Sequence, residues 1–479
     1  MSFDRRDFIR GMALAGMAAD ANAEDAAKPA TIGQPKDATR NLARFVVASK
    51  PDDVPATVKK EAARTLLNWA GCAVGGSRHE TVNIAVGALS PFSGPAQATL
   101  LGRKERMDVM NAALINGIAS HIFDYDDTHL RTVIHPAGPV ASAILALSEY
   151  RPIVGRDFVH ALVLGVEVEC RIGNAVYPAH YDAGWHITGT AGVFGSAAAV
   201  GKLLGLGEQQ MIWALGIAAT QPTGLKEMFG TMTKSFHPGR AAQSGLTAAF
   251  LASRNFTSSD QPLEAKAGWM NVLSTSRDYT ELSKKLGQTY EISLNTYKPF
   301  ACGVVIHPAI DGCIQLRNQY KLTADQIDRI DLRVHPLVLE LTGKKTPQTG
   351  LEGKFSVYYA AAVAIVKGAA GEREFSDALV LDPAIVALRD RVTATVDPSV
   401  GEAQVRIAIT LIDGRRLEKS VEKVIGSVEN PLSDLALEAK FLDLSSGILP
   451  EAQGRKMIDL CWNAEKLTSA GEIAKAAAL

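Results

Sequence analysis

The sequence predicts a mainly α-helical protein, in which a large all-helical domain carries an inserted, smaller α+β lid domain. Three observations lead to this prediction. Residues 37–275 repeat apolar side chains at helical spacing almost throughout, strand-like alternation begins after residue 276, and residues 431–479 return to a helical pattern. We therefore expect a helical domain over 37–275, a lid over 276–430, and C-terminal helices that rejoin the first domain.

The predicted helical domain contains several recognisable helices. Helix formers and regularly spaced apolar residues predict one helix over 58–73, and residues 110–121 place apolar side chains and His121 on one face of a second. Helices predicted over 188–204 and 238–253 are rich in Ala and Gly, which allows helix axes to approach closely. This half should therefore form a compact, buried bundle.

The predicted lid mixes strands with helices. Apolar and charged residues alternate over 330–334, a pattern typical of a half-buried strand. Two further alternating segments, 405–411 and 416–421, flank a turn at Asp413-Gly414 and predict a β-hairpin. A helical pattern over 355–367 lies between these strands.

The N-terminus resembles an export signal. Residues 1–23 contain Arg5-Arg6 in a twin-arginine context, then a weakly apolar stretch and an Ala-Asn-Ala cleavage-like triplet. The alternative is a basic N-terminal arm, because paired arginines are common. We expect a twin-arginine signal over 1–23, a linker over 24–36 and a periplasmic protein, or a cytoplasmic one if the signal is not used.

Composition excludes several classes of protein. The chain has 479 residues with 50 basic and 51 acidic side chains, so it offers no basic excess for nucleic acid. It has no run of 18 apolar residues that could span a membrane. Five cysteines without a CxxC pair predict neither a disulfide scaffold nor a structural zinc site. The P-loop, dinucleotide, G-x-S-x-G and EF-hand patterns are all broken.

A dense group of titratable residues follows the predicted helix over 110–121. Residues 121–129 contain three carboxylates and two imidazoles. Negative charge at the C-terminal end of a helix opposes the helix dipole, so the group costs stability unless something compensates. A solvated acidic loop would explain one Asp. Crowded carboxylates between apolar helices more often have perturbed pKa values, which suits general-base catalysis.

Cationic or protonatable side chains stand just before four predicted helices. They are His135, His186, Lys234 with His237, and Lys298. Helix N-termini bind anions through free N–H groups and the dipole. Any one of these side chains alone is better explained as structural. If the four ends converge, they form a cage for a substrate with several carboxylates.

A metal site is the alternative for the same region. Asp124, Asp126, His129 and His135 include ligand types of suitable chemistry. Only their spacing supports this alternative, and the sequence shows no residues that would hydrogen-bond to these ligands and orient them on a metal. We expect no metal and no cofactor.

The chain resembles the 2-methylcitrate dehydratase (MmgE/PrpD) family, which includes cis-aconitate decarboxylase and iminodisuccinate epimerase. The matching segments include HIFDYDDTHLRTVIHPAG, FGTMTKSFHPGRAAQSGLTAAFLA, KPFACGVVIHPAID and GKFSVYYAAAVA. The resemblance implies a helical domain with an α+β lid, a homodimer, no cofactor, and chemistry on small di- and tricarboxylates. Carried over through these motifs, it implies site positions at Asp124, Thr128, His135, His186, Lys234, Lys298 and Tyr359.

Pattern and resemblance together define the predicted site. The catalytic candidates are Asp124, His135, His186, Lys234 and Lys298, and the substrate-binding candidates are Thr128, His237 and Tyr359.

The predicted activity is that of a cofactor-independent lyase or isomerase, which removes a proton next to a carboxylate. A hydro-lyase like 2-methylcitrate dehydratase is favoured over a decarboxylase or epimerase of the same family. Ile187 stands where members often have Pro, and the loop over 128–135 is about one residue longer than in the decarboxylase, so the substrate stays open. The rival classes are an exported carboxylate-binding protein and a divalent-metal hydrolase.

Overall fold

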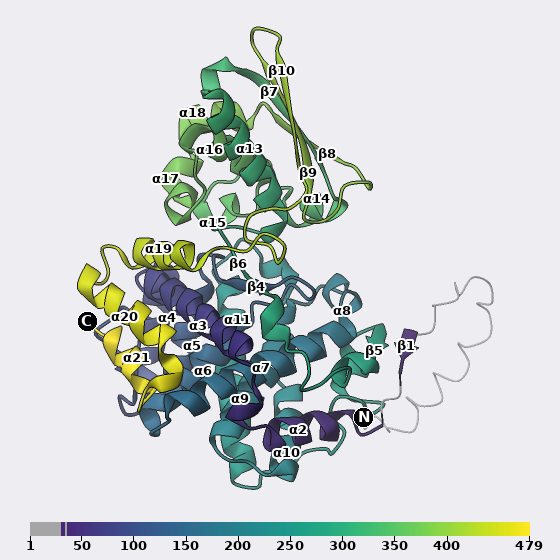
Figure 1. Ribbon diagram of the computed structural model, residues 1–479, viewed down its shortest axis with the longest axis vertical. Helices are drawn as coiled ribbons and strands as arrows, with labels where there is room; N and C mark the ends of the chain where they lie inside the picture. The colour runs from purple at the N-terminus through teal and green to yellow at the C-terminus, as the bar shows by residue number, and fades with distance from the viewer. Residues whose placement is uncertain (1–29, 34–35) are drawn as a thin grey trace, which may run out of the picture.

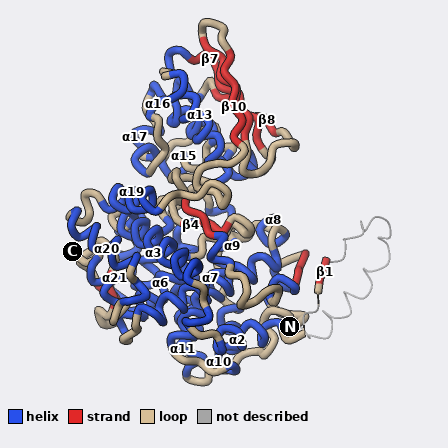
Figure 2. The backbone as a smooth tube through the Cα atoms, in the orientation of Figure 1, coloured by secondary structure: helices blue, strands red, loops and turns tan. Residues whose placement is uncertain are grey.

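The computed structural model describes residues 30–33 and 36–479, and these form two bodies of unequal size (Figure 1). The larger body is helical, and the strands gather mainly in the smaller one (Figure 2). The mainly helical class is therefore confirmed. The predicted signal over 1–23 lies outside the described residues, as does most of the predicted linker. Within that linker, β1 (Ala30–Ile32) pairs in parallel with β5 (Ser276–Asp278).

The helical body is organised around α9, which packs against helices on both sides. Its neighbour α7 contacts α6, and its neighbour α11 contacts both α5 and α6, so these five helices form the centre of the helical body. The five helices are α5 (Val109–His121), α6 (Ala137–Tyr150), α7 (Gly155–Val176), α9 (Ile187–Leu203) and α11 (Thr233–Ser253). Around them lie α2 (Ala38–Ala48), α3 (Ala56–Gly76), α4 (Glu80–Leu89), α8 (Ala179–Asp182), α10 (Glu208–Ala219) and α12 (Trp269–Leu273).

Small residues allow α5, α6 and α11 to meet closely. A Cβ atom added to Gly117 would lie 2.5 Å from the Cα of Gly239, and one added to Gly138 would lie 3.1 Å from Pro238. A larger side chain at Gly117 would push α11 away from α5. This crossing matters for function, because the chain leaves α5 toward Asp124.

The predicted start of α11 was wrong. We expected Pro238 to open the helix, since proline favours the first turn, but α11 begins at Thr233 and contains Pro238. Lys234 and His237 therefore belong to the first turns of the helix and do not precede it. Pro238 packs against Gly138 at the helix crossing.

The smaller body is a four-stranded sheet with helices on one face. Its strand order is β10-β9-β7-β8, where β7 and β8 run parallel and the other pairs are antiparallel. The predicted strand and hairpin are both present. The strands are β7 (Ile327–Val334), β8 (Val392–Val396), β9 (Val405–Leu411) and β10 (Arg416–Val421), and the covering helices are α13 (His307–Tyr320), α14 (Pro336–Thr342), α16 (Val357–Lys367) and α18 (Pro383–Arg389).

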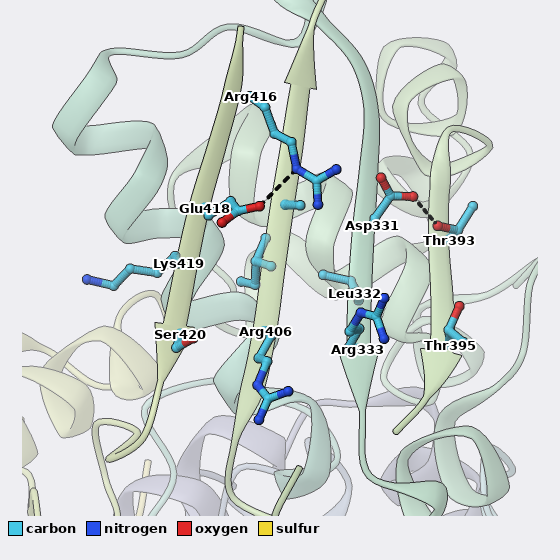
Figure 3. Close-up of a pocket in the computed structure, with 12 residues that line it drawn as sticks. Asp331, Leu332, Arg333, Thr393, Thr395, Arg406, Arg416, Glu418, Lys419 and Ser420 are labelled. Carbon is cyan, nitrogen blue, oxygen red and sulfur yellow. Dashed lines mark hydrogen bonds and ion pairs between the residues drawn. The ribbon is translucent and has the colours of Figure 1, made fainter. Parts of the chain in front are cut away.

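The other face of this sheet is open to solvent and carries polar side chains (Figure 3). A groove of about 420 Å³ runs over it. Arg416 pairs with Glu418 at 2.9 Å, and the Thr393 hydroxyl donates to Asp331 at 2.7 Å. Exposed pairs of this kind contribute little to stability. The alternation of polar and apolar residues in the sequence follows directly from this one-sided covering.

The chain passes between the two bodies near residue 298 and again near residue 430. Tyr279 and Tyr290 pack in the cores of the helical body, so residues 276–297 belong with it, although we placed them in the lid. Their mixture of short strands and turns resembles the lid in sequence, but their aromatic side chains point into the larger body. After the sheet, α19 (Asp434–Ser445), α20 (Glu451–Trp462) and α21 (Gly471–Ala476) return to pack on α3 and α6 (Figure 1).

Two further features bear on the class of protein. Within the described residues, every helix is too short or too polar to cross a bilayer. All five cysteines are buried as free thiols.

Candidate active site between the two bodies

A small buried cavity lies where the helical body meets the lid, and it collects most of the predicted site residues. Its volume is about 50 Å³. The helical body contributes Asp124, Thr128, Val133, His135, Tyr181, His186, Phe229, Lys234 and Lys298, and the lid contributes Gly303, Val304, Val305, Leu337, Leu341, Thr342 and Phe355. The four predicted helix starts therefore do converge on one cavity.

A two-stranded ladder brings Lys298 beside Asp124. The strand β4 (Asp127–His129) pairs antiparallel with β6 (Asn295–Tyr297). Asp124 lies just before β4 and Lys298 just after β6, so an antiparallel pairing places them at the same end of the ladder. The contact thus joins residues far apart in the sequence.

Asp124 holds both lysines of the site. Its Oδ1 accepts from the Lys298 ammonium at 2.6 Å and lies 2.9 Å from that of Lys234. Its backbone is in the left-handed region, with φ of 50°, which is uncommon outside Gly and Asn. Asp124 Oδ2 is buried without a hydrogen-bond partner among the described atoms. The second oxygen is therefore free to accept a hydrogen bond from a ligand.

Charge pairing in this cluster outweighs burial at Asp124. Burial alone would raise the pKa of Asp124, but the ammonium groups of Lys234 and Lys298 hold it well below its ordinary value. Burial lowers the pKa of Lys234, although Asp124 partly offsets this. Lys298 is also buried, yet Asp124 and then Asp126 raise its pKa. Asp124 is thus an ionised carboxylate and a weak base.

His135 is a neutral imidazole with a defined tautomer. Its Nδ1 lies 2.8 Å from the carbonyl oxygen of Asp127, and a carbonyl only accepts, so Nδ1 carries the proton. Burial lowers the pKa of His135 to about 3, although Asp126 opposes the shift. The Nε2 atom therefore carries a lone pair at neutral pH. The backbone N–H of His135 donates to the hydroxyl of Thr188, which ties this loop to α9.

Two residues outside the predicted catalytic and substrate-binding set, Asp126 and His121, extend the cluster around Asp124. Asp126 accepts a hydrogen bond from His121 Nδ1 at 2.7 Å, and its other oxygen lies 3.4 Å from His135 Nδ1. Burial would raise the pKa of Asp126, but the imidazoles of His121 and His135 lower it below its ordinary value. His121 Nε2 is buried without a partner among the described atoms. The sequence showed the dense stretch over 121–129 but not which of its members faced inward.

His186 and His237 form a second buried imidazole pair. Their Nδ1 atoms are 2.8 Å apart, so one ring donates and the other accepts. Burial lowers the pKa of both, for His237 to about 4. His186 caps α9 and lines the cavity, whereas His237 lies behind it. His237 thus supports His186 instead of reaching the cavity itself.

Lys440 ties the site to the C-terminal helices. Its ammonium donates to Asn68 Oδ1 and to the carbonyl oxygens of Tyr125 and Lys298 at 2.6–2.9 Å. One side chain from α19 therefore fixes both segments that carry the Asp124–Lys298 contact. Nothing in the sequence pattern of α19 distinguished this lysine from a surface one.

The structure does not bring Tyr359 to the cavity. Its hydroxyl donates to the carbonyl oxygen of Glu374, inside the core of the lid. Phe355, four residues earlier, lines the cavity instead, and the Lys234 ammonium lies 5.1 Å from the centre of its ring. The start of α16 explains the difference. Ser356 caps this helix, and Tyr359 lies on the side of it that packs into the core of the lid.

Two groups of side chains in this region could offer ligand atoms to a metal. They are His121, His135 and His186, and Asp124, Asp126 and His135, each with atoms within 4.8 Å of one another. A cation bound at Asp124 would meet the ammonium groups of Lys234 and Lys298, which already occupy its Oδ1. The group that contains Asp124 therefore fits a metal poorly. The absence of a metal remains a prediction.

Comparison with known proteins agrees with this architecture. The chain matches the MmgE/PrpD N-terminal domain over residues 40–282 and the MmgE/PrpD C-terminal domain over residues 300–464. It is 27% identical to cis-aconitate decarboxylase of Aspergillus terreus over 87% of this chain and 91% of that protein. It is also 27% identical to cis-aconitate decarboxylase of Homo sapiens, over 90% and 92% of the two chains. Together, the two domain matches show that this chain belongs to the MmgE/PrpD family.

Proposed function

We propose that this protein is a cofactor-independent lyase or isomerase that acts on a small di- or tricarboxylate by removing a proton next to a carboxylate. One observation carries the proposal. Two lysines, two neutral histidines and an ionised aspartate from separate segments of the chain share one cavity, whose other walls are mainly apolar. Perturbed groups that converge in a cleft are typical of catalytic sites.

The lysines supply what the chemistry needs most. The proton next to a carboxylate is very weakly acidic, so the enediolate-like charge formed on its removal must be stabilised. Lys234 and Lys298 are preorganised for this, since Asp124 already fixes their positions. Val304 and Val305 begin a continuous helical run toward Tyr320, and helix starts of this kind favour anions.

The protonation states favour His135 as the base. Its Nε2 has a lone pair at neutral pH, whereas Asp124 is paired with two cations and has little basicity. A bound polycarboxylate adds negative charge beside His135, which raises its pKa toward the working pH. His186 is placed to bind substrate or to protonate the leaving group, and Thr128 to bind a carboxylate.

Loss of water follows removal of the proton next to the carboxylate, whereas loss of CO2 leaves an electron pair on the substrate that takes up a proton; both reactions need the lysines to hold a carboxylate and the histidines to move a proton. A hydro-lyase of the 2-methylcitrate dehydratase type was favoured from the sequence. The names of the relatives from Aspergillus terreus and Homo sapiens favour a cis-aconitate-type decarboxylase as the second candidate. An epimerase would only return the proton to the other face.

A substrate screen separates these candidates. We would incubate the purified protein with 2-methylcitrate, citrate, the aconitate isomers and iminodisuccinate, and follow products by NMR. Formation of an alkene with water, or release of CO2, assigns the reaction. Binding of these acids without turnover would favour the carboxylate-binding protein, and activity that EDTA abolishes would favour the metal hydrolase.

The proposal includes export and a homodimer. The predicted twin-arginine signal implies a periplasmic enzyme, so replacing Arg5 and Arg6 by Lys should retain the protein in the cytoplasm. Unchanged periplasmic recovery would contradict the twin-arginine signal. Light scattering on the purified protein should give twice the chain mass of 51.0 kDa, and a monomer mass would contradict the dimer.

A further inference from the structure

A second cavity adjoins the catalytic one, and we call it the side chamber. Its volume is about 100 Å³, against about 50 Å³ for the catalytic cavity. Val133, Lys298, Val304, Val305 and Leu337 line both cavities, so the two share a wall. Leu130, Thr296, His307, Glu402, Ala403 and residues 424–427 complete the chamber.

The polar side chains on the inner wall of the side chamber, Thr296 and His307, are already hydrogen-bonded to the backbone. The Thr296 hydroxyl donates to the Thr128 carbonyl oxygen at 2.7 Å, and His307 Nε2 lies 3.3 Å from the Cys302 carbonyl oxygen. Burial lowers the pKa of His307 to about 3, so its ring is neutral. Each of these groups already uses its donor, so neither offers a hydrogen bond to a ligand carboxylate.

Charge separates the roles of the two cavities. The Lys298 ammonium is committed to Asp124 on the catalytic side, which leaves its aliphatic stem to face the chamber. The one carboxylate that lines the chamber, Glu402, is exposed at its rim and repels a second anion. A ligand carboxylate is therefore favoured in the catalytic cavity and disfavoured in the side chamber.

The shared wall contains a strained residue. Val133 has φ of 53°, in the left-handed region, which is rare for a β-branched side chain. Such strain is maintained only where the surroundings require it, and it concentrates at functional sites. Here it holds an apolar side chain between the two cavities.

We propose that the side chamber binds an unbranched alkyl substituent, two or more carbons long, on the polycarboxylate substrate. The proposal rests on the proposed function, because it assumes that the carboxylates bind at Lys234 and Lys298. A space of about 100 Å³ holds several water-sized groups, so it exceeds what a methyl group fills. The substituent passes along the Lys298 stem and buries itself against Leu130, Val304 and Ile425.

Binding of unreactive analogues tests the proposal without relying on turnover. We would titrate the full-length protein with succinate, 2-methylsuccinate and 2-propylsuccinate by calorimetry. Each buried methylene should tighten binding about fourfold, so 2-propylsuccinate should bind at least tenfold tighter than succinate. Affinity that stays flat or falls with chain length, or no detectable binding of any of the three, would overturn the proposal.

Variants that fill the side chamber supply the control. Leu130→Phe and Ile425→Phe add volume from the helical body and from the lid, and should remove most of the preference for 2-propylsuccinate. Ile412→Phe adds the same volume at an exposed site in the turn between β9 and β10 and should keep the preference. Thermal unfolding checks that each variant is folded. If neither filling variant changes the preference while both are folded, the chamber is not the alkyl site.

The outcomes also distinguish this proposal from the proposed function. If alkyl preference is present but no polycarboxylate is turned over, the side chamber is supported and the lyase or isomerase activity is refuted. If citrate-like acids are turned over with no preference for alkyl substituents, the activity is supported and the side chamber is refuted.

Discussion

Replacing Asp124 by Asn separates its charge from its shape. The variant has nearly the same volume and keeps an oxygen that accepts from Lys298, but it removes the carboxylate that both buried ammonium groups contact. Removing one partner of a buried ion pair costs about 3–5 kcal/mol, and the retained acceptor favours the lower end. We therefore expect the free energy of unfolding to fall by about 3 kcal/mol.

The same substitution should tighten the binding of an unreactive dicarboxylate. In the wild type, a ligand carboxylate competes with Asp124 Oδ1, which lies 2.6 Å from Lys298 and 2.9 Å from Lys234. Without that competitor, a hydrogen bond to a charged group contributes about 1.5–3 kcal/mol. Succinate should then bind about ten- to a hundredfold tighter, while turnover falls because the lysines lose their fixed positions.

Calorimetric titration with succinate and thermal unfolding with and without it measure both effects. Asp328→Asn is the matched control, since Asp328 pairs with Arg329 on the surface and should change neither quantity by much. If Asp124→Asn bound succinate more weakly than the wild type, and unfolded at the same temperature, the lysine-holding role of Asp124 would be refuted.

Three other substitutions test separate parts of the structure. Burial raises the pKa of Glu169 well above its ordinary value of 4.5, so above pH 4.5 the folded state keeps a proton that the unfolded state loses. Stability should therefore fall as the pH rises above 4.5. Glu169→Gln should reduce this fall, measured as the difference in Tm between about pH 5.5 and pH 8.5. An unchanged pH dependence would contradict a protonated Glu169. Lys440→Met should lower kcat more than tenfold in the folded protein, and near-normal kcat would show that its three contacts do not position the site. Tyr359→Phe should leave kinetics within about twofold and cost about 1 kcal/mol of stability by denaturant unfolding, whereas a large rise in KM would return Tyr359 to substrate binding.

Local pattern predicted much of the fold, because apolar spacing depends mainly on which face of an element is buried. The hairpin over 405–421 and the strand over 330–334 were correct for this reason. The start of α11 was not, because proline at a first turn and proline at a helix crossing look the same in sequence. Residues 276–297 were assigned to the lid because packing partners, and not local pattern, decide which body they join.

The sequence predicted most of the charged and titratable residues that line the cavity, but it did not predict the residues that hold them in place. The positions before helices pointed to His135, His186 and Lys298, since helix starts have a local signature. The roles of Asp126 and Lys440 depend on contacts across the fold, which no local pattern shows.

Proton removal by His135 is the central claim, and exchange with solvent deuterium tests it most directly. We would incubate substrate with wild-type protein and with His135→Gln in ²H₂O and follow deuterium at the carbon next to the carboxylate by NMR. General-base catalysis contributes about 10²–10⁴-fold, so the wild type should exchange or convert the substrate and the folded variant should be at least a hundredfold slower. The claim would be contradicted if wild-type protein neither exchanged nor converted any acid of the panel, or if His135→Gln did so at the wild-type rate.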